Sequence, residues 1–232
     1  MDRFDFAAHS SSQYNEEMKA IHSQLMQMGA LVRRQLADAV QAVLTGDASL
    51  VAAVLAREED VDALEKRIDE GCAHVLALRQ PAATDLRLLI AVSKCVSDFE
   101  RIGDEAVKVA KAAAQLAEAE QPVDVDGIAD IGTHVGRMLE DALTSFTDFD
   151  ARKAVDVAVD MRYRDALRTL AGRKIASPDA IPQLLNLTWV LRSLERVGDH
   201  AHNISEQVIY LVIGRDVRHL SVEQITNAIG GG

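Results

Sequence analysis

Hydrophobic residues along most of the chain recur at intervals of three and four positions, which is the period of one face of an α-helix. In the first such stretch Met18, Ile21 and Leu25 begin the series and Val43 closes it. The stretches with this period are 14–44, 48–78, 83–117, 128–148, 151–175 and 181–213. The pattern therefore predicts six long helices and no strand.

The breaks between these stretches carry residues typical of helix ends. Gly46 and Asp47 are suited to cap one helix and begin the next. Gln80 and Pro81 separate the second stretch from the third, and a turn around Pro178 separates the fifth from the sixth. Gly214 is expected to end the sixth helix.

The acidic segment 118–127 contains a proline and a glycine and divides the six stretches into two groups of three. Three long helices joined by short loops form an antiparallel bundle. We therefore expect an all-α protein with two tandem three-helix bundles. The expected division is a disordered N-terminal lead at 1–12, a first repeat at 13–120, a second repeat at 126–214 and a C-terminal tail at 215–232.

Composition supports helices and argues against a nucleic-acid partner. Hydrophobic residues make up 48% of the chain, aromatic residues only 4%, and the net charge is −11. A protein that binds duplex nucleic acid needs a basic face, which this charge disfavours. No signal peptide or membrane-spanning run is evident, so we expect a cytoplasmic protein. Cys72, Cys95 and Trp189 are expected in the core.

One short motif occurs twice, 95 residues apart. Residues 99–110 read FERIGDEAVKVA and residues 194–205 read LERVGDHAHNIS. In each copy two acids lie four positions apart, which places them on one face of a helix. A glycine between them costs a helix about 1 kcal/mol, yet both copies carry one. The recurrence suggests two packed helices that each present paired carboxylates.

Another acid pair, Glu58 and Asp62, lies on the second predicted helix. Its centre is 21 positions before Pro81, and the centre of the Glu100 and Asp104 pair is 21 positions after it. In an antiparallel hairpin these four carboxylates would be neighbours. Crowded carboxylates repel, and a bound cation relieves that repulsion. Oxygen ligands suit hard ions such as magnesium or manganese, and also iron. The alternative is a solvated acidic helix face.

The corresponding site in the second half is less regular. Aligning the two halves at Asp47 and Asp150 makes Asp165 the partner of Glu195 and Asp199, and puts Met161 where the first half has Glu58. A second alignment would use the acid pair Asp156 and Asp160 but loses the match of apolar positions, and Asp160 is kept as an extra ligand beside Asp165. Asn203 extends the row by one turn with an amide oxygen.

No nucleotide-binding or serine-nucleophile motif is present, and we expect the chain not to be an enzyme. The alternative is a carboxylate-bridged di-iron enzyme, whose helices carry a Glu-x-x-His pattern. Here only Asp199 and His202 approach that spacing, and Val107 stands at the matching position of the first half.

These motifs together resemble the PhoU family, regulators of bacterial phosphate uptake. The resemblance covers roughly residues 13–220. It rests on both E-R-[IV]-G-D motifs, LMQMG at 25–29, RQPAATDLR at 79–87, HAHN at 200–203 and GRDVRH at 214–219. It implies two PhoU-type three-helix bundles.

The resemblance also implies a function and a set of ligands. Family members bind clusters of metal ions, such as iron, zinc, manganese or magnesium, on paired E(D)xxxD motifs. Carried over, the metal ligands are Glu58, Asp62, Glu100, Asp104, Asp165, Glu195, Asp199 and Asn203. The implied role is a negative regulator of the phosphate regulon that also modulates phosphate uptake. The implied partners are the phosphate ABC transporter ATPase subunit and a phosphate-sensing histidine kinase. These would recruit the protein to the inner membrane. The oligomeric state is left open, with a homodimer as one alternative.

Overall fold

A computed structural model describes residues 12–119, 125, 127–158, 181–218, 220 and 222–230. Three long helices form the first half: α1 (Ser12–Thr45), α2 (Ala48–Arg79) and α3 (Ala83–Ala117). The second half contains α4 (Ile128–Asp148), α5 (Ala151–Ala158), α7 (Ile181–Ile213) and α8 (Val222–Gly230). No strand occurs among these residues, which confirms the all-α prediction.

The helix ends lie close to their predicted positions because capping residues set them. Gly46 adopts a left-handed φ of 69°, and its N–H donates to the carbonyl of Ala42 at 2.8 Å. Asp47 then caps α2, its carboxylate accepting the Ser49 N–H at 2.8 Å. Gly214 ends α7 in the same way as Gly46, with a φ of 72°. The predicted fifth helix, 151–175, is described only as far as Ala158.

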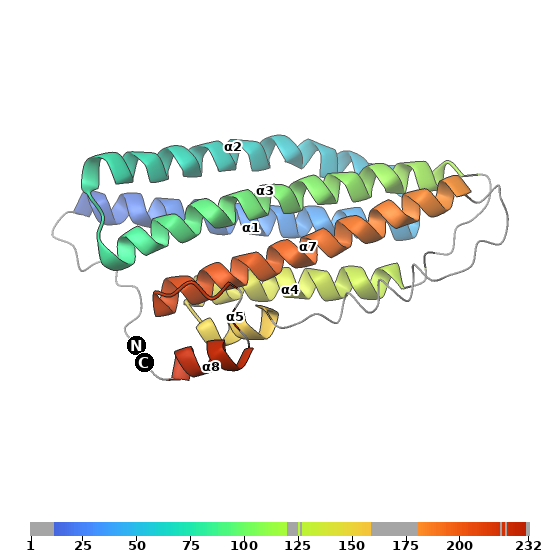
Figure 1. Ribbon diagram of the computed structural model, residues 1–232. Helices are drawn as coiled ribbons and strands as arrows, with labels where there is room; N and C mark the ends of the chain where they lie inside the picture. The colour runs from blue at the N-terminus through green and yellow to red at the C-terminus, as the bar shows by residue number, and fades with distance from the viewer. Residues whose placement is uncertain are drawn as a thin grey trace.

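Four helices form the centre of the molecule. α1 packs on α3, α3 on α7, α7 on α4, and α4 on α1, which closes a ring of neighbours. α2 covers α1 and α3 on one side, and α5 packs against α4 and α7 on the other (Figure 1). The most extensive of these contacts is between α3 and α7, the two helices that carry the repeated motif.

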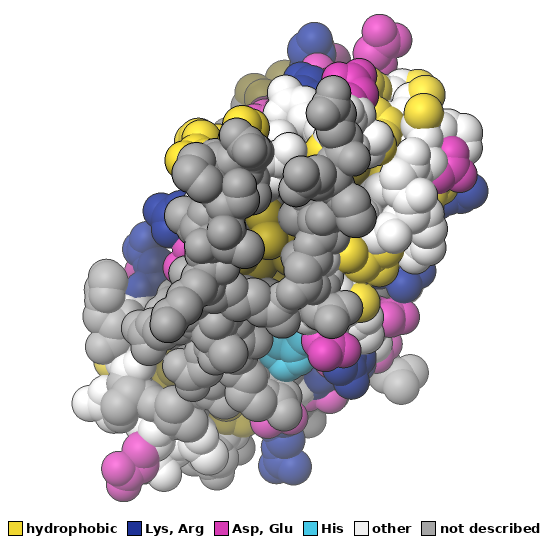
Figure 2. Space-filling model, turned by 90° about the vertical axis from the view of Figure 1, so that its right-hand side faces the viewer, with side chains coloured by type: hydrophobic (Ala, Val, Ile, Leu, Met, Phe, Trp, Pro, Cys, Tyr) yellow, Lys and Arg dark blue, Asp and Glu magenta, His cyan; other side chains and the backbone are white. Residues whose placement is uncertain are grey.

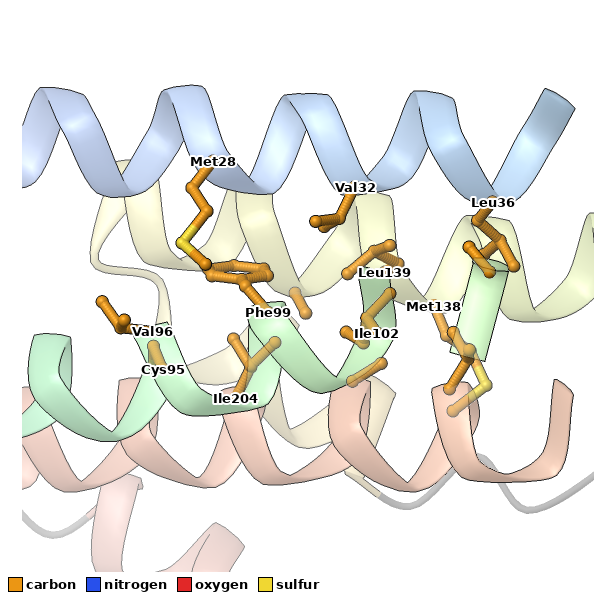
Figure 3. Packing of buried hydrophobic residues seen from close by; sticks show 14 of the residues in the cluster. Met28, Val32, Leu36, Cys95, Val96, Phe99, Ile102, Met138, Leu139 and Ile204 are labelled. Atoms are coloured by element: carbon orange, nitrogen blue, oxygen red, sulfur yellow. The ribbon is translucent and has the colours of Figure 1, made fainter. Parts of the chain in front are cut away.

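The two halves therefore share one hydrophobic core. Figure 3 shows Met28 from α1, Phe99 from α3, Leu139 from α4 and Ile204 from α7 pointing into the same interior. Each of these four side chains is fully buried, with an exposed fraction of 0%. The sequence pattern predicted which face of each helix is buried, but it gave no sign that the two bundles would merge.

One sequence-based expectation needs correction. Trp189 is 65% exposed, not in the core, because it lies on the outer face of α7 with Ile181 and Leu185. Hydrophobic side chains are accordingly exposed at the surface of the end of the molecule where α7 begins (Figure 2). The predicted C-terminal tail contains the short helix α8, which packs against α5 and buries Ile225.

Both cysteines are free and buried, as predicted. Burial raises the pKa of the Cys72 thiol to about 12 and raises that of Cys95 well above its usual value. None of the described helices is both long and apolar enough to cross a membrane.

Candidate functional site

The first-half acids gather between α2 and α3. Glu100 and Asp104 are half-buried on α3, one helical turn apart. Burial is the main cause of the raised pKa of Glu100, and the negative charges of Asp104 and Glu65 raise it further. The negative charge of Asp62 also raises the pKa of Glu100. The structure thus brings three of the four predicted first-half ligands within electrostatic reach of one another.

Sequence reasoning missed Glu65 as a member of this group. Its pKa is also raised, chiefly by burial, and then by the charges of Asp69 and Asp62. Glu65 follows Asp62 by three positions and so shares its helix face, a spacing that would have identified it. Glu58, by contrast, is half-buried one turn earlier and is not among the residues that raise the pKa of Glu100.

The carboxylates are crowded but do not converge on one point. Within the described part of the chain, no group of three or more His, Cys, Asp or Glu side chains is close enough together to hold a metal ion. The donor chemistry suits a hard cation, because each side chain offers carboxylate oxygens that repel their neighbours. Side-chain rotation would be needed to bring them onto a shared ion, and the ligand set stays a prediction.

The second-half site is only partly visible. Asp165 lies outside the described residues, as do Asp160 and Met161. Glu195 is half-buried on α7, and its carboxylate accepts a bond from Arg192 Nη1 at 2.6 Å. Asp199 is half-buried one turn further along the helix. The prediction that these acids bind metal is therefore untested in this half.

Asn203 faces the other half of the molecule. Its amide Nδ2 donates to Oδ1 of Asp98 at 3.2 Å, and Nδ1 of His200 lies 2.8 Å from the same oxygen. His200 is buried, so this polar group of three sits within the α3–α7 contact. His200 is therefore bonded to a partner on the opposite helix. Asp98 was not predicted, because it lies outside the repeated motif.

A second ionic group joins the same two helices. Oε1 of Glu105, whose side chain is 3% exposed, lies 3.0 Å from Arg196 Nη1 and 3.0 Å from Lys108 Nζ. Arg196 belongs to the second E-R-[IV]-G-D motif, and Glu105 directly follows the first. The arginine of the second motif thus helps to join the two halves.

The glycine of the first motif is buried beside two other helices. A Cβ added to Gly103 would lie 3.4 Å from Gln35 Oε1 and 3.6 Å from Val32 and Val61. These neighbours belong to α1 and α2. The distances are those of ordinary van der Waals contact, so an alanine would fit at this position. Packing therefore does not explain why the repeated motif carries a glycine here in spite of its cost in helix propensity.

Comparison with known proteins agrees with this architecture. The PhoU domain family matches residues 25–113 and 128–208. A phosphate-specific transport system accessory protein PhoU homolog of Pseudomonas putida is 46% identical over 229 residues, covering 96% of this chain and 90% of its own length. Escherichia coli (strain K12) PhoU is 35% identical, covering 100% of this chain and 98% of its own.

Two solved structures are also similar. The crystal structure of PhoU from Pseudomonas aeruginosa has a TM-score of 0.81 and 47% sequence identity, covering 88% of this chain and 100% of that one. The phosphate transport system regulatory protein PhoU from Streptococcus pneumoniae has a TM-score of 0.82 at 27% identity, covering 88% and 99%. Fold, repeated matches and full-length similarity lead to one conclusion: the chain belongs to the PhoU family.

Proposed function

We propose that this chain is an accessory protein of a phosphate-specific transport system that holds the phosphate regulon off and restrains uptake when phosphate is plentiful. The observation that carries the proposal is similarity over the whole chain to relatives named for that system. Membership in this family of accessory proteins confirms that the chain is not an enzyme. The alternative of a di-iron enzyme has no support from the comparisons. His202, the histidine that approaches the required spacing, has its Nε2 3.4 Å from Glu206.

In this proposal the protein acts by contact and stays on the cytoplasmic side of the membrane. The ATPase subunit of the transporter and the sensor histidine kinase are its partners. The long helices suit such a role, because a four-helix centre with a shared core is a rigid body with several separate outer faces. Two proteins can then bind to it at the same time.

The proposal also includes metal ions bound by the carboxylates. Asp62, Glu65, Glu100 and Asp104 would hold a divalent cation between α2 and α3, and Glu58 would join them. Glu195 and Asp199 would serve the second site with Asp165. A bound ion would neutralise the repulsion among the acids and brace neighbouring helices against each other. The proposal assigns the ion a structural contribution and no chemical step.

The test is affinity purification of the tagged full chain from cells grown with ample phosphate. The proposal expects both the transporter ATPase subunit and the sensor kinase in the eluate, at levels well above a tag-only control. Recovery of one partner would limit the role to transport or to signalling. Recovery of neither would overturn the proposal.

A further inference from the structure

A groove runs along the outer side of the contact between α1 and α4. Its volume is about 660 Å³. The residues of α1 that line it include Ala30, Arg33, Arg34, Ala37 and Leu44, and those of α4 include Ala129, Gly136 and Arg137. They repeat at three and four positions, so the groove follows one face of each helix over roughly 20 Å.

The floor of the groove is apolar. Leu36 and Val40 are buried beneath it, and Leu44 is half-buried at one end. Alanines on both helices and two glycines on α4 keep the walls of the groove low. A free inorganic anion would gain nothing from such a floor, whereas the apolar face of an amphipathic helix would lose water there.

The rim of the groove is basic. Three arginines line it, at positions 33, 34 and 137, together with a single glutamate, Glu140, which pairs with Arg33 at 3.5 Å. The charged residues of the lining therefore sum to +2, on a chain whose net charge is −11. Arginine forks bind carboxylates with two parallel hydrogen bonds, so this rim favours acidic side chains.

Gly136 has no close packing neighbour among the residues that the structure describes. A Cβ added there would meet nothing within 4 Å, although glycine costs a helix about 1 kcal/mol relative to alanine. One turn earlier the situation is the opposite, because a Cβ on Gly132 would lie 2.6 Å from Val40 Cγ1. The absent side chain at Gly136 leaves room above α4 for a third helix.

We propose that this groove is the surface on which the protein receives an acidic amphipathic helix of a partner protein. The apolar face of that helix lies on Ala37, Val40 and Leu44, and its acids pair with Arg34 and Arg137. The inference rests on the proposed function, since it names the surface through which one partner is held.

The first test places a photo-reactive amino acid at Ala37, inside the groove, in the full chain. The control position is Ala52, which is exposed on α2. Illumination of phosphate-replete cells should cross-link position 37, and not position 52, to a segment of another protein with acids on one helical face and hydrophobic residues on the other. A cross-link to a second copy of this chain, or to a segment without acids, would overturn the inference.

The second test uses variants in the affinity purification. Gly136→Leu fills the groove without a clash, and the double variant Arg34→Glu/Arg137→Glu reverses its charge. Each variant should lower partner recovery at least tenfold relative to wild type. The control variant Arg67→Glu, at an exposed position of α2 outside the groove, should leave recovery unchanged. Unchanged circular dichroism would establish that the variants fold. Normal recovery with the groove variants would refute this surface and leave the proposed function intact. Failure of the wild type to recover any partner would refute both.

Discussion

Nδ1 of His200 lies 2.8 Å from Oδ1 of Asp98, although the two residues are 102 positions apart in the chain. The contact joins the motif-bearing helices α3 and α7 across the middle of the molecule. Because the His200 side chain is largely buried, Asp98 supplies the polar partner that its imidazole needs, and the same Asp98 oxygen also accepts a hydrogen bond from Asn203.

We expect Asp98→Ala to lower the free energy of unfolding by about 1–3 kcal/mol, since it leaves the buried His200 imidazole without its acceptor. His200→Ala should cost a similar amount. The double variant should cost clearly less than the sum, because the interaction can be lost only once. Urea denaturation of the four proteins measures this, and strictly additive losses would contradict a direct coupling.

Glu100→Gln should have opposite effects with and without a divalent cation. The raised pKa of Glu100, compared with its usual 4.5, means that the folded metal-free protein binds a proton here more tightly than the unfolded chain does. Stability therefore falls as the pH rises from about 4.5 through the raised pKa. At pH 7 the variant should melt up to roughly 2–4 °C higher than wild type without metal.

With manganese or magnesium added, wild type should gain stability by mass action and Glu100→Gln should gain much less. Thermal melts with and without EDTA supply the measurement, and Glu118→Gln, at the C-terminal end of α3, is the matched control. Equal stabilisation of wild type and Glu100→Gln by the cation would remove Glu100 from the metal site.

The glycines of α4 offer a paired test of packing. Gly132→Ala should lower stability by about 1–3 kcal/mol, because the new Cβ meets a stiff valine side chain at Val40. Gly136→Ala should raise stability by up to about 1 kcal/mol through helix propensity alone. Chemical denaturation of both variants provides the comparison. A loss of stability in Gly136→Ala would show that the space above α4 is already filled within the chain.

The thiols of Cys72 and Cys95 should be unreactive in the folded protein. Both are buried, and burial raises the pKa of each, so the reactive thiolate is scarce at neutral pH. A colourimetric thiol reagent should detect no fast-reacting group in the native state and two groups in denaturant. Rapid modification of either cysteine at pH 7 would contradict the packing of α2 or α3.

Local sequence signals predicted several helix ends well because those ends carry capping residues of their own. Gly46, Asp47 and Gly214 mark ends that the structure confirms to within a residue or two. The prediction that Trp189 is buried was wrong because it relied on the residue type and ignored the position of residue 189 on the helix. The buried hydrophobic residues of this part of α7 are Leu187, Val190, Leu191 and Leu194, and residue 189 lies off that stripe.

The candidate site was predictable only in part. Spacing on either side of Pro81 predicted a hairpin register in which Asp62 faces Glu100, and in the structure the charge of Asp62 does act on Glu100. Asp98 and Glu105 were beyond reach, because their partners come from α7, and no local pattern shows which faces of two distant helices will meet. The structural role of Arg196 was missed for the same reason.

The claim that the chain restrains phosphate uptake and signalling is tested most directly by deleting its gene and measuring alkaline phosphatase activity and phosphate uptake in phosphate-rich medium. The account predicts high phosphatase activity and excess uptake in the deletion strain, and a return to low values when the wild-type gene is restored. Low phosphatase activity and unchanged uptake in the deletion strain would contradict it.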